Sequence, residues 1–194
     1  LACVSFADMC VGEIMDGLEA GPNRDNTIVV LWSDHGFHLG EKQHWAKRTL
    51  WEESTRTPLI IAGAGIDAGE DCHEAVSLLD IYPTLVKLCE LPKNAQLDGI
   101  SLAPQLNDPH TPRDTPVIST SYYENHAVRT RDWRYIRYAD GAEELYDHRS
   151  DPDEFTNLAN HADHQQTKRS LAKWLPQNAA AEVKTLGKQR RKKN

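Results

Sequence analysis

The first hundred residues alternate between helix-like and strand-like patterns of apolar positions. In residues 1–20 apolar side chains recur every three or four positions, and Gly21 ends the run, which predicts an amphipathic helix. The stretch "TIVVLWS" (27–33) is continuously apolar and rich in β-branched residues, as in a strand of a parallel sheet that is covered on both faces. "TPLIIAGAG" (57–65) has the same character. This order predicts an α/β domain with a parallel sheet flanked by helices.

The pattern changes in the second half of the chain. A short helix is predicted within 45–57 and a longer one within 75–91, where Asp80 is the expected N-cap. The segment 107–116, "NDPHTPRDTP", is rich in Pro, Asp and Thr and is predicted to be a subdomain boundary. The runs that follow, joined by turns, predict a small antiparallel sheet, with a helix at about 163–174. We therefore expect an α/β part at 1–106, a small α+β subdomain at 107–176 and a basic, disordered tail at 177–194.

Composition narrows the functional class. The 194 residues carry a formal net charge of -7, which argues against general binding to nucleic acid. The basic run at 188–193 is interpreted as a solvated tail, with a polyanion contact as the alternative. We find no signal peptide and no apolar run long enough to span a membrane. Because the chain opens at Leu1 inside a predicted helix, we expect it to be a fragment.

The four cysteines match no zinc or redox motif. Cys3 and Cys10 fall on one face of the first predicted helix, so we expect buried free thiols there. The cysteines therefore do not indicate whether the protein works in an oxidising or a reducing compartment.

Candidate chemistry stands at the end of the first predicted strand. Asp34 and His35 come directly after "VVLWS", and ligands of open α/β sheets bind beyond the carboxyl ends of the strands. Gly36 is expected to permit backbone angles that let both side chains converge. A carboxylate beside an imidazole is a metal half-site, or an acid that orients a general base. The alternative is that Asp34 caps the next helix. Lys47 lies in the loop that returns to the sheet, where its cation suits an anionic oxygen.

Ordered motifs along the chain resemble a known family. "SDHGFHLGE", "WAK", "TPLII", "LLDIYPTL", "LDGISLAP" and "RTRDWRYIRYADGAEELYDHRSDPDEFTNLA" resemble, in the same order, the C-terminal part of the type I sulfatases. These enzymes are the formylglycine-dependent branch of the alkaline phosphatase-like superfamily, and the resemblance is strongest to iduronate-2-sulfatase-like members. It implies the C-terminal portion of an alkaline phosphatase-like parallel-sheet domain, followed by a small antiparallel sheet with a helix.

The resemblance also implies roles for individual residues. Asp34 and His35 match late ligands of one calcium ion, and calcium's preference for oxygen makes Asp34 the more typical of the two. Lys47 matches the lysine that grips the sulfate ester and would neutralise charge on the transferring group. His38, His44 and His126 are candidates for lining the substrate pocket. The implied substrate is a sulfated carbohydrate, such as a glycosaminoglycan or an algal polysaccharide, and the implied location is periplasmic, secreted or lysosomal.

Part of the family's machinery does not occur in this sequence. The "C/S-x-P-x-R" motif that yields the formylglycine nucleophile is absent, and the nearest approach is "CELPK" at Cys89. Asp34 and His35 offer too few donors for calcium, which takes about six to eight oxygens. We therefore expect this chain to need the N-terminal half of the same domain as its partner, and to be inactive alone.

Two other functions stay open at this point. A phosphodiesterase or phosphonate hydrolase of the same superfamily would use the Asp-His pair for one of two transition-metal ions, with His73 or His110 as a further ligand. A truncated, non-catalytic protein could bind glycans through the aromatic and basic run "VRTRDWRYIRY". Against that reading, the run also fits an amphipathic strand with exposed arginines and buried Trp133 and Tyr135. Arg56 is expected to anchor its loop through Glu52 or Glu53.

The coding DNA upstream of Leu1 separates the fragment from the truncated protein. We expect the open reading frame to continue upstream into a "C/S-x-P-x-R" motif. An authentic start codon at this position would contradict that expectation and favour the non-catalytic protein.

Overall fold

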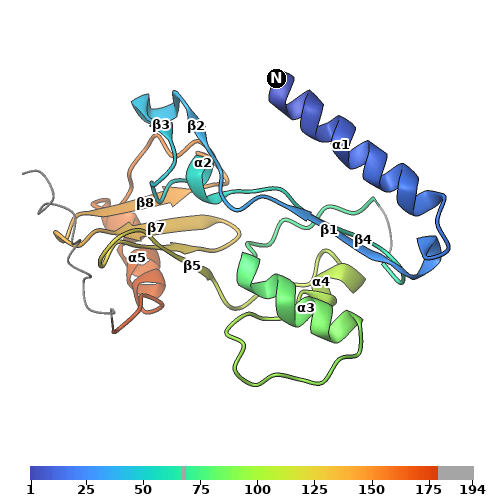
Figure 1. The fold of residues 1–194 in the computed structure, drawn as a ribbon. Helices are drawn as coiled ribbons and strands as arrows, with labels where there is room; N and C mark the ends of the chain where they lie inside the picture. The colour runs from blue at the N-terminus through green and yellow to red at the C-terminus, as the bar shows by residue number, and fades with distance from the viewer. Residues whose placement is uncertain (67–68, 179–194) are drawn as a thin grey trace, which may run out of the picture.

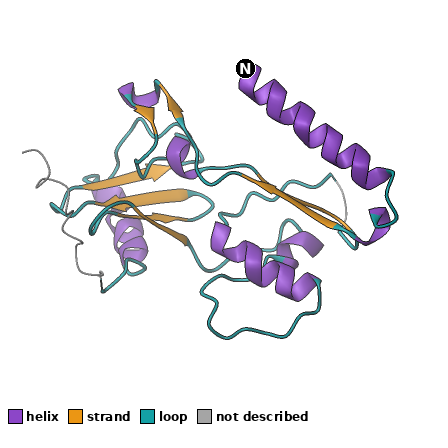
Figure 2. Ribbon diagram, in the orientation of Figure 1, coloured by secondary structure: helices purple, strands orange, loops and turns teal. Residues whose placement is uncertain are grey.

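The computed structural model describes residues 1–66 and 69–178 (Figure 1). The predicted tail therefore lies outside the described residues, apart from 177 and 178. An extended first part carries helix α1, and a second part is built around a four-stranded sheet (Figure 2). The helices and strands are α1 (Ala2–Glu19), β1 (Ile28–Trp32), β2 (His38–Leu39), β3 (Trp45–Ala46), α2 (Glu52–Thr55), β4 (Leu59–Gly63), α3 (Ile81–Leu88), α4 (Ala103–Asn107), β5 (Val117–Thr120), β6 (His126–Arg129), β7 (Trp133–Arg137), β8 (Glu143–Asp147) and α5 (Gln165–Ala172).

Strands β1 and β4 form where the apolar runs predicted them, but they pair antiparallel rather than parallel. Val30 lies opposite Ile61 in a register that extends from Ile28 to Trp32. Parallel neighbours need a crossover, usually through a helix of several turns. The connection between these two strands instead contains the short β2–β3 hairpin and the four-residue α2, and it turns the chain back along the same edge.

Helix α1 confirms the predicted amphipathic helix, although its apolar side is uncovered. No residue of α1 is buried, and Figure 1 shows the helix lying apart from the sheets. The expectation of buried thiols is wrong, because Cys3 and Cys10 are exposed and unpaired. Their helical face meets no other described element that would cover it. Neither α1 nor another described helix is long and apolar enough to cross a membrane.

Asp80 is the N-cap residue of α3, as predicted, but its side chain caps the 3₁₀ turn just before it, Leu78–Asp80, rather than α3 itself. The hydroxyl of Ser77 accepts from the backbone N–H of Leu79, and the Asp80 carboxylate accepts from the N–H of Ser77. Asp80 therefore completes the capping box of this 3₁₀ turn, which leads directly into α3. The same buried carboxylate accepts from Ile100 N and pairs with Arg113 at 2.8 Å, which ties α3 to the segment that leads into β5.

The four-stranded sheet is an antiparallel meander in the order β5-β6-β7-β8, as predicted for the second half. One face packs against α5 around Tyr135 and Leu171. The other face packs on Leu50, which comes from the connection between β1 and β4. Both faces of the sheet are therefore covered, and the connection that leaves β1 is part of the core of the second subdomain. The predicted boundary at 107–116 falls between the end of α4 and the start of β5.

We expect Asp80→Ala to lower the free energy of unfolding by about 3–5 kcal/mol, because it leaves a nearly buried guanidinium without its partner. Arg113 has 7% of its side chain exposed and Asp80 has 2%. Urea denaturation followed by circular dichroism measures the change.

Asp98→Ala is the matched control, since Asp98 is exposed and surface substitutions usually change stability by less than about 0.5 kcal/mol. Equal losses from the two variants would contradict this role for Asp80.

Candidate functional site

The turn that leaves β1 places Asp34 and His35 next to each other. Asp34 Oδ2 lies 3.5 Å from His35 Nε2, and the aspartate side chain is 81% exposed. Asp34 does not cap a helix, because the chain continues into β2. Gly36 serves a different purpose from the predicted one. Its N–H donates to Ser54 O, and a Cβ at this position would lie 1.9 Å from Glu53 O, so only glycine lets the turn lie against α2.

The ring of His35 is oriented by its neighbours. Its Nδ1 lies 2.7 Å from the carbonyl oxygen of Gly36, and a carbonyl only accepts, so Nδ1 carries the proton. The lone pair of Nε2 is then free to act as an acceptor or a metal ligand. The Nζ of Lys47 donates to this nitrogen. The structure thus brings together the three residues that the sequence singled out: Asp34, His35 and Lys47.

The three pocket histidines predicted from the sequence lie in different surroundings. His38 is fully buried, bonds Thr49 through Nε2 and meets the ring of His44 edge-on. His44 is half-buried on the hairpin, with Nε2 3.5 Å from Lys47 O. His126 is 5% exposed and lies 2.9 Å from the hydroxyl of Thr120; burial, together with the charge of Arg137, lowers its pKa. His44 therefore lies against the backbone of Lys47.

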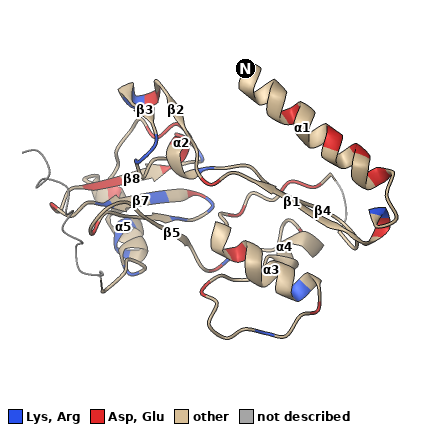
Figure 3. Ribbon diagram, viewed as in Figure 1, with Lys and Arg blue, Asp and Glu red and all other residues tan. Residues whose placement is uncertain are grey.

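A cleft of about 1410 Å³ opens beside this turn, between the first part of the chain and the four-stranded sheet. Its wall includes Asp34, His35 and His73, but not Lys47 or His110. Five arginines also line it, together with acidic residues from both parts of the chain. They are Arg56, Arg129, Arg131, Arg134 and Arg149. The cleft therefore offers a polar, mixed-charge surface next to the Asp34–His35 pair, consistent with the charges on the sheet in Figure 3.

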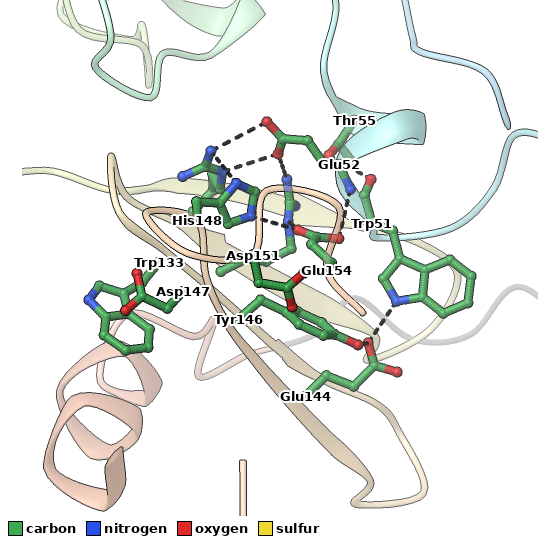
Figure 4. Close-up of polar contacts among 12 residues, drawn as sticks. Trp51, Glu52, Thr55, Trp133, Glu144, Tyr146, Asp147, His148, Asp151 and Glu154 are labelled. Atoms are coloured by element: carbon green, nitrogen blue, oxygen red, sulfur yellow. Dashed lines mark hydrogen bonds and ion pairs between the residues drawn. The ribbon is translucent and has the colours of Figure 1, made fainter. Parts of the chain in front are cut away.

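A buried ionic network joins α2 to the four-stranded sheet (Figure 4). Arg134, predicted to be exposed, is 2% exposed, and its guanidinium donates to both Glu154 and Glu52. Arg129 also donates to Glu52, at 3.1 Å. His148 accepts from Arg129 at Nδ1 and donates to Glu154 from Nε2. Two guanidinium groups thus balance two carboxylates, with the imidazole between them.

The charges of this network control the ionisation of both carboxyl groups. Burial raises the pKa of Glu52, but the nearby Arg134 and Arg129 outweigh it and hold that pKa at about 2. Burial also opposes ionisation of Glu154, whose pKa is nevertheless lowered by the hydrogen bond from His148 and the charge of Arg134. Both carboxylates therefore stay charged at neutral pH.

Ligand atoms of Glu52, His148 and Glu154 lie within 4.8 Å of one another, yet this cluster does not fit a metal ion. The lone pair of His148 faces Arg129, and each carboxylate already accepts from the guanidinium of Arg134. A cation here would face two fixed positive charges. The cluster is an ion-pair network.

Most contacts of this ionic network were not predicted from the sequence. Arg56 was expected to pair with Glu52 or Glu53, but Arg56 is exposed and Glu52 instead bonds Arg129 and Arg134 from the distant sheet. The motif "DPDEFTNLA" contains Glu154, but nothing in its sequence pattern indicates that Glu154 is buried. The run "VRTRDWRYIRY" does not form a continuous binding surface, since Arg134 and Tyr135 in it are buried.

Comparisons with known proteins show the family of this chain. Residues 40–181 match the family described as N-sulphoglucosamine sulphohydrolase, C-terminal. A sulfatase of Formosa agariphila is 43% identical over 180 residues, which cover 93% of this chain and 36% of that protein. Human arylsulfatase K is 35% identical, with 81% of this chain and 32% of that protein covered. The chain thus spans about a third of the length of these relatives.

Solved structures resemble the chain over most of its length. The structure of BT4656 in complex with its substrate D-glucosamine-2-N,6-O-disulfate has a TM-score of 0.76 and 30% identity, covering 89% of this chain and 38% of that one. A phosphonate monoester hydrolase of Agrobacterium radiobacter has a TM-score of 0.72 and 26% identity, covering 86% and 37%. The fold is that of the C-terminal portion of an alkaline phosphatase-like enzyme. The chain belongs to the sulfatases, as a member of the N-sulphoglucosamine sulphohydrolase C-terminal family.

Proposed function

We propose that the full-length protein carrying this chain hydrolyses sulfate esters of sulfated sugars. The observation that supports this best is the convergence of Asp34, His35 and Lys47 at the end of β1, beside an open polar cleft. The solved relative with a disulfated glucosamine substrate supports the same class. The iduronate-2-sulfatase-like subtype and the particular sugar stay predictions.

We further propose that Asp34 and His35 supply part of a calcium site. The exposed carboxylate offers oxygen, and His35 Nε2 lies 3.5 Å from it. This nitrogen accepts from Lys47 in the structure, so it would bind the ion once the ammonium turns to the sulfate group. Calcium needs more oxygen ligands than this pair provides, so the N-terminal part of the domain must contribute the rest. When bound, the ion would supply positive charge to polarise the sulfate group and its nucleophile.

Lys47 is proposed to hold the sulfate group of the substrate. Its ammonium is exposed and is fixed beside the metal pair by the β2–β3 hairpin. A positive charge placed there offsets negative charge on the transferring group and the leaving oxygen. The nucleophile, a formylglycine, is expected from the N-terminal part. His44, His126 and His38 stay candidates for contacts with the sugar, with His44 the best placed by its distance from Lys47.

Hydrolysis of a phosphate or phosphonate ester is the second candidate. It is favoured by the likeness to the phosphonate monoester hydrolase and by His73, which lines the same cleft as Asp34 and His35. Purified full-length protein assayed on matched aryl sulfate, phosphate and phosphonate esters, with metal content measured by mass spectrometry, separates the two. We expect faster sulfate hydrolysis and calcium as the bound metal. Preference for the phosphorus esters with zinc or manganese bound would overturn the proposal.

In the full-length enzyme, Asp34→Ala is expected to lower calcium occupancy and activity together, because it removes the oxygen ligand. Lys47→Ala should lower kcat/KM by about 100-fold, the usual effect of removing one charge-stabilising donor, while calcium stays bound. Steady-state kinetics and metal analysis measure both.

Lys87→Ala is the control, since Lys87 is an exposed lysine at the end of α3 and its loss should change neither quantity. Full activity of Lys47→Ala would show that this lysine does not hold the sulfate.

A further inference from the structure

We propose that Glu154 is a positioning residue for the candidate site: its buried carboxylate holds the Asp34–His35 turn through α2, and its backbone oxygen holds the Lys47 hairpin through Lys42. This inference rests on the proposed function, which assigns the site to those residues. Glu154 belongs to the second subdomain and contacts none of the three itself. It acts through α2 and through Lys42.

Glu154 makes contacts in three directions from a fully buried position. Its Oε1 accepts from Arg134 and His148, and its Oε2 accepts from the backbone N–H of Glu52 at 3.0 Å. Its backbone oxygen accepts from the ammonium of Lys42. A φ of 58° places this residue in the left-handed region. The Asp151 carboxylate supports this turn by accepting from two backbone N–H groups that follow Glu154.

The first path runs through α2 to His35. The bond from Glu52 N to Glu154 fixes the start of α2. Arg134 donates to Leu50 O, just before α2, and to the side chain of Glu52, its first residue. The Asp34–His35 turn is bonded to the end of α2, because Gly36 N donates to Ser54 O. The backbone of Gly36 also lies so close to Glu53 O that a Cβ has no room. A movement of α2 must therefore carry the Asp34–His35 turn with it.

The second path runs through Lys42 to Lys47. Lys42 lies between β2 and β3, and its ammonium also lies 4.7 Å from the ring centroids of Trp51 and Tyr146. This residue has a positive φ, 52°, which a favourable contact has to stabilise. Strand β3 pairs with β2 and leads directly into Lys47. Loss of the Lys42 contact would free the hairpin that carries Lys47.

The carboxylate charge is necessary for this arrangement. All groups that face the two Glu154 oxygens are donors: a guanidinium, an imidazole N–H and a backbone N–H. An amide of the same shape would turn an NH₂ group towards one of these donors. It would also remove the negative charge that balances the guanidinium of Arg134. Buried donors without an acceptor are costly, so Glu154→Gln should displace α2 without changing the size of the side chain.

A double-mutant cycle in the full-length enzyme tests this proposal. Glu154→Gln should lower kcat/KM about tenfold or more in the native background, because small displacements of catalytic groups are costly. In the Lys47→Ala background, which has already lost one of the positioned groups, the same change should cost less than about threefold, since coupled residues are not additive. Additive losses would overturn the proposal. The cycle is run on whichever ester the enzyme hydrolyses, so a phosphatase result refutes the proposed function but not this inference.

Hydrogen–deuterium exchange gives a readout that needs no activity. Glu154→Gln should raise exchange in peptides that cover 34–56, where the Gly36 N–H is bonded to Ser54. Glu143→Gln is the matched control. Its carboxylate accepts from Tyr135 and Lys168, on the α5 side of the same sheet, so it should raise exchange there and leave both 34–56 and kcat/KM unchanged. Unchanged exchange of 34–56 in Glu154→Gln, or an equal increase in the control, would show that Glu154 has only a structural role.

Discussion

The buried guanidinium of Arg134 is the charge on which the junction between the two parts of the chain depends. From the second position of β7 it reaches Glu154 in its own subdomain, and Glu52 and Leu50 O in the connection that leaves β1. Burying such a charge costs several kcal/mol unless it is fully paired. Only one relative placement of α2 and the sheet supplies all of its acceptors. The ionic network therefore contributes more to the specificity of the junction than to its net stability.

This junction explains why the C-terminal subdomain and the candidate site cannot be treated separately. Leu50 packs in the core on one face of the sheet, next to Ile136 and Tyr146. Two residues later α2 begins, and the Asp34–His35 turn lies on α2. The sheet therefore supports a candidate site whose proposed residues Asp34, His35 and Lys47 come from the first part of the chain. Figure 4 shows Glu52 of α2 next to His148 and Glu154, which follow β8.

From the sequence one could predict that Asp34, His35 and Lys47 lie together, but not the long-range packing. Asp34, His35 and Lys47 could be located because a buried strand ends at "SDHG" and a lysine follows in the returning loop. The burial of Arg134 could not be predicted, because the alternation of side chains along β7 shows only that Arg134 faces away from Tyr135. What covers that face is a segment about eighty residues earlier, Leu50 with α2. The antiparallel pairing of β1 and β4 was missed for the same reason: strand-like composition does not fix direction.

Burial is distributed unevenly along the described residues. Both buried hydrophobic clusters belong to the sheet, α5 and Leu50, whereas α1 and the ends of β1 and β4 leave Trp32 and Ile60 exposed. The Asp34–His35 turn thus stands between a weakly covered strand and a well-packed subdomain. Within the described residues, the turn is held from the packed side by the bond from Gly36 N to Ser54 O of α2. The contacts of the turn with α2 therefore determine the position at which the imidazole of His35 contacts the ammonium of Lys47.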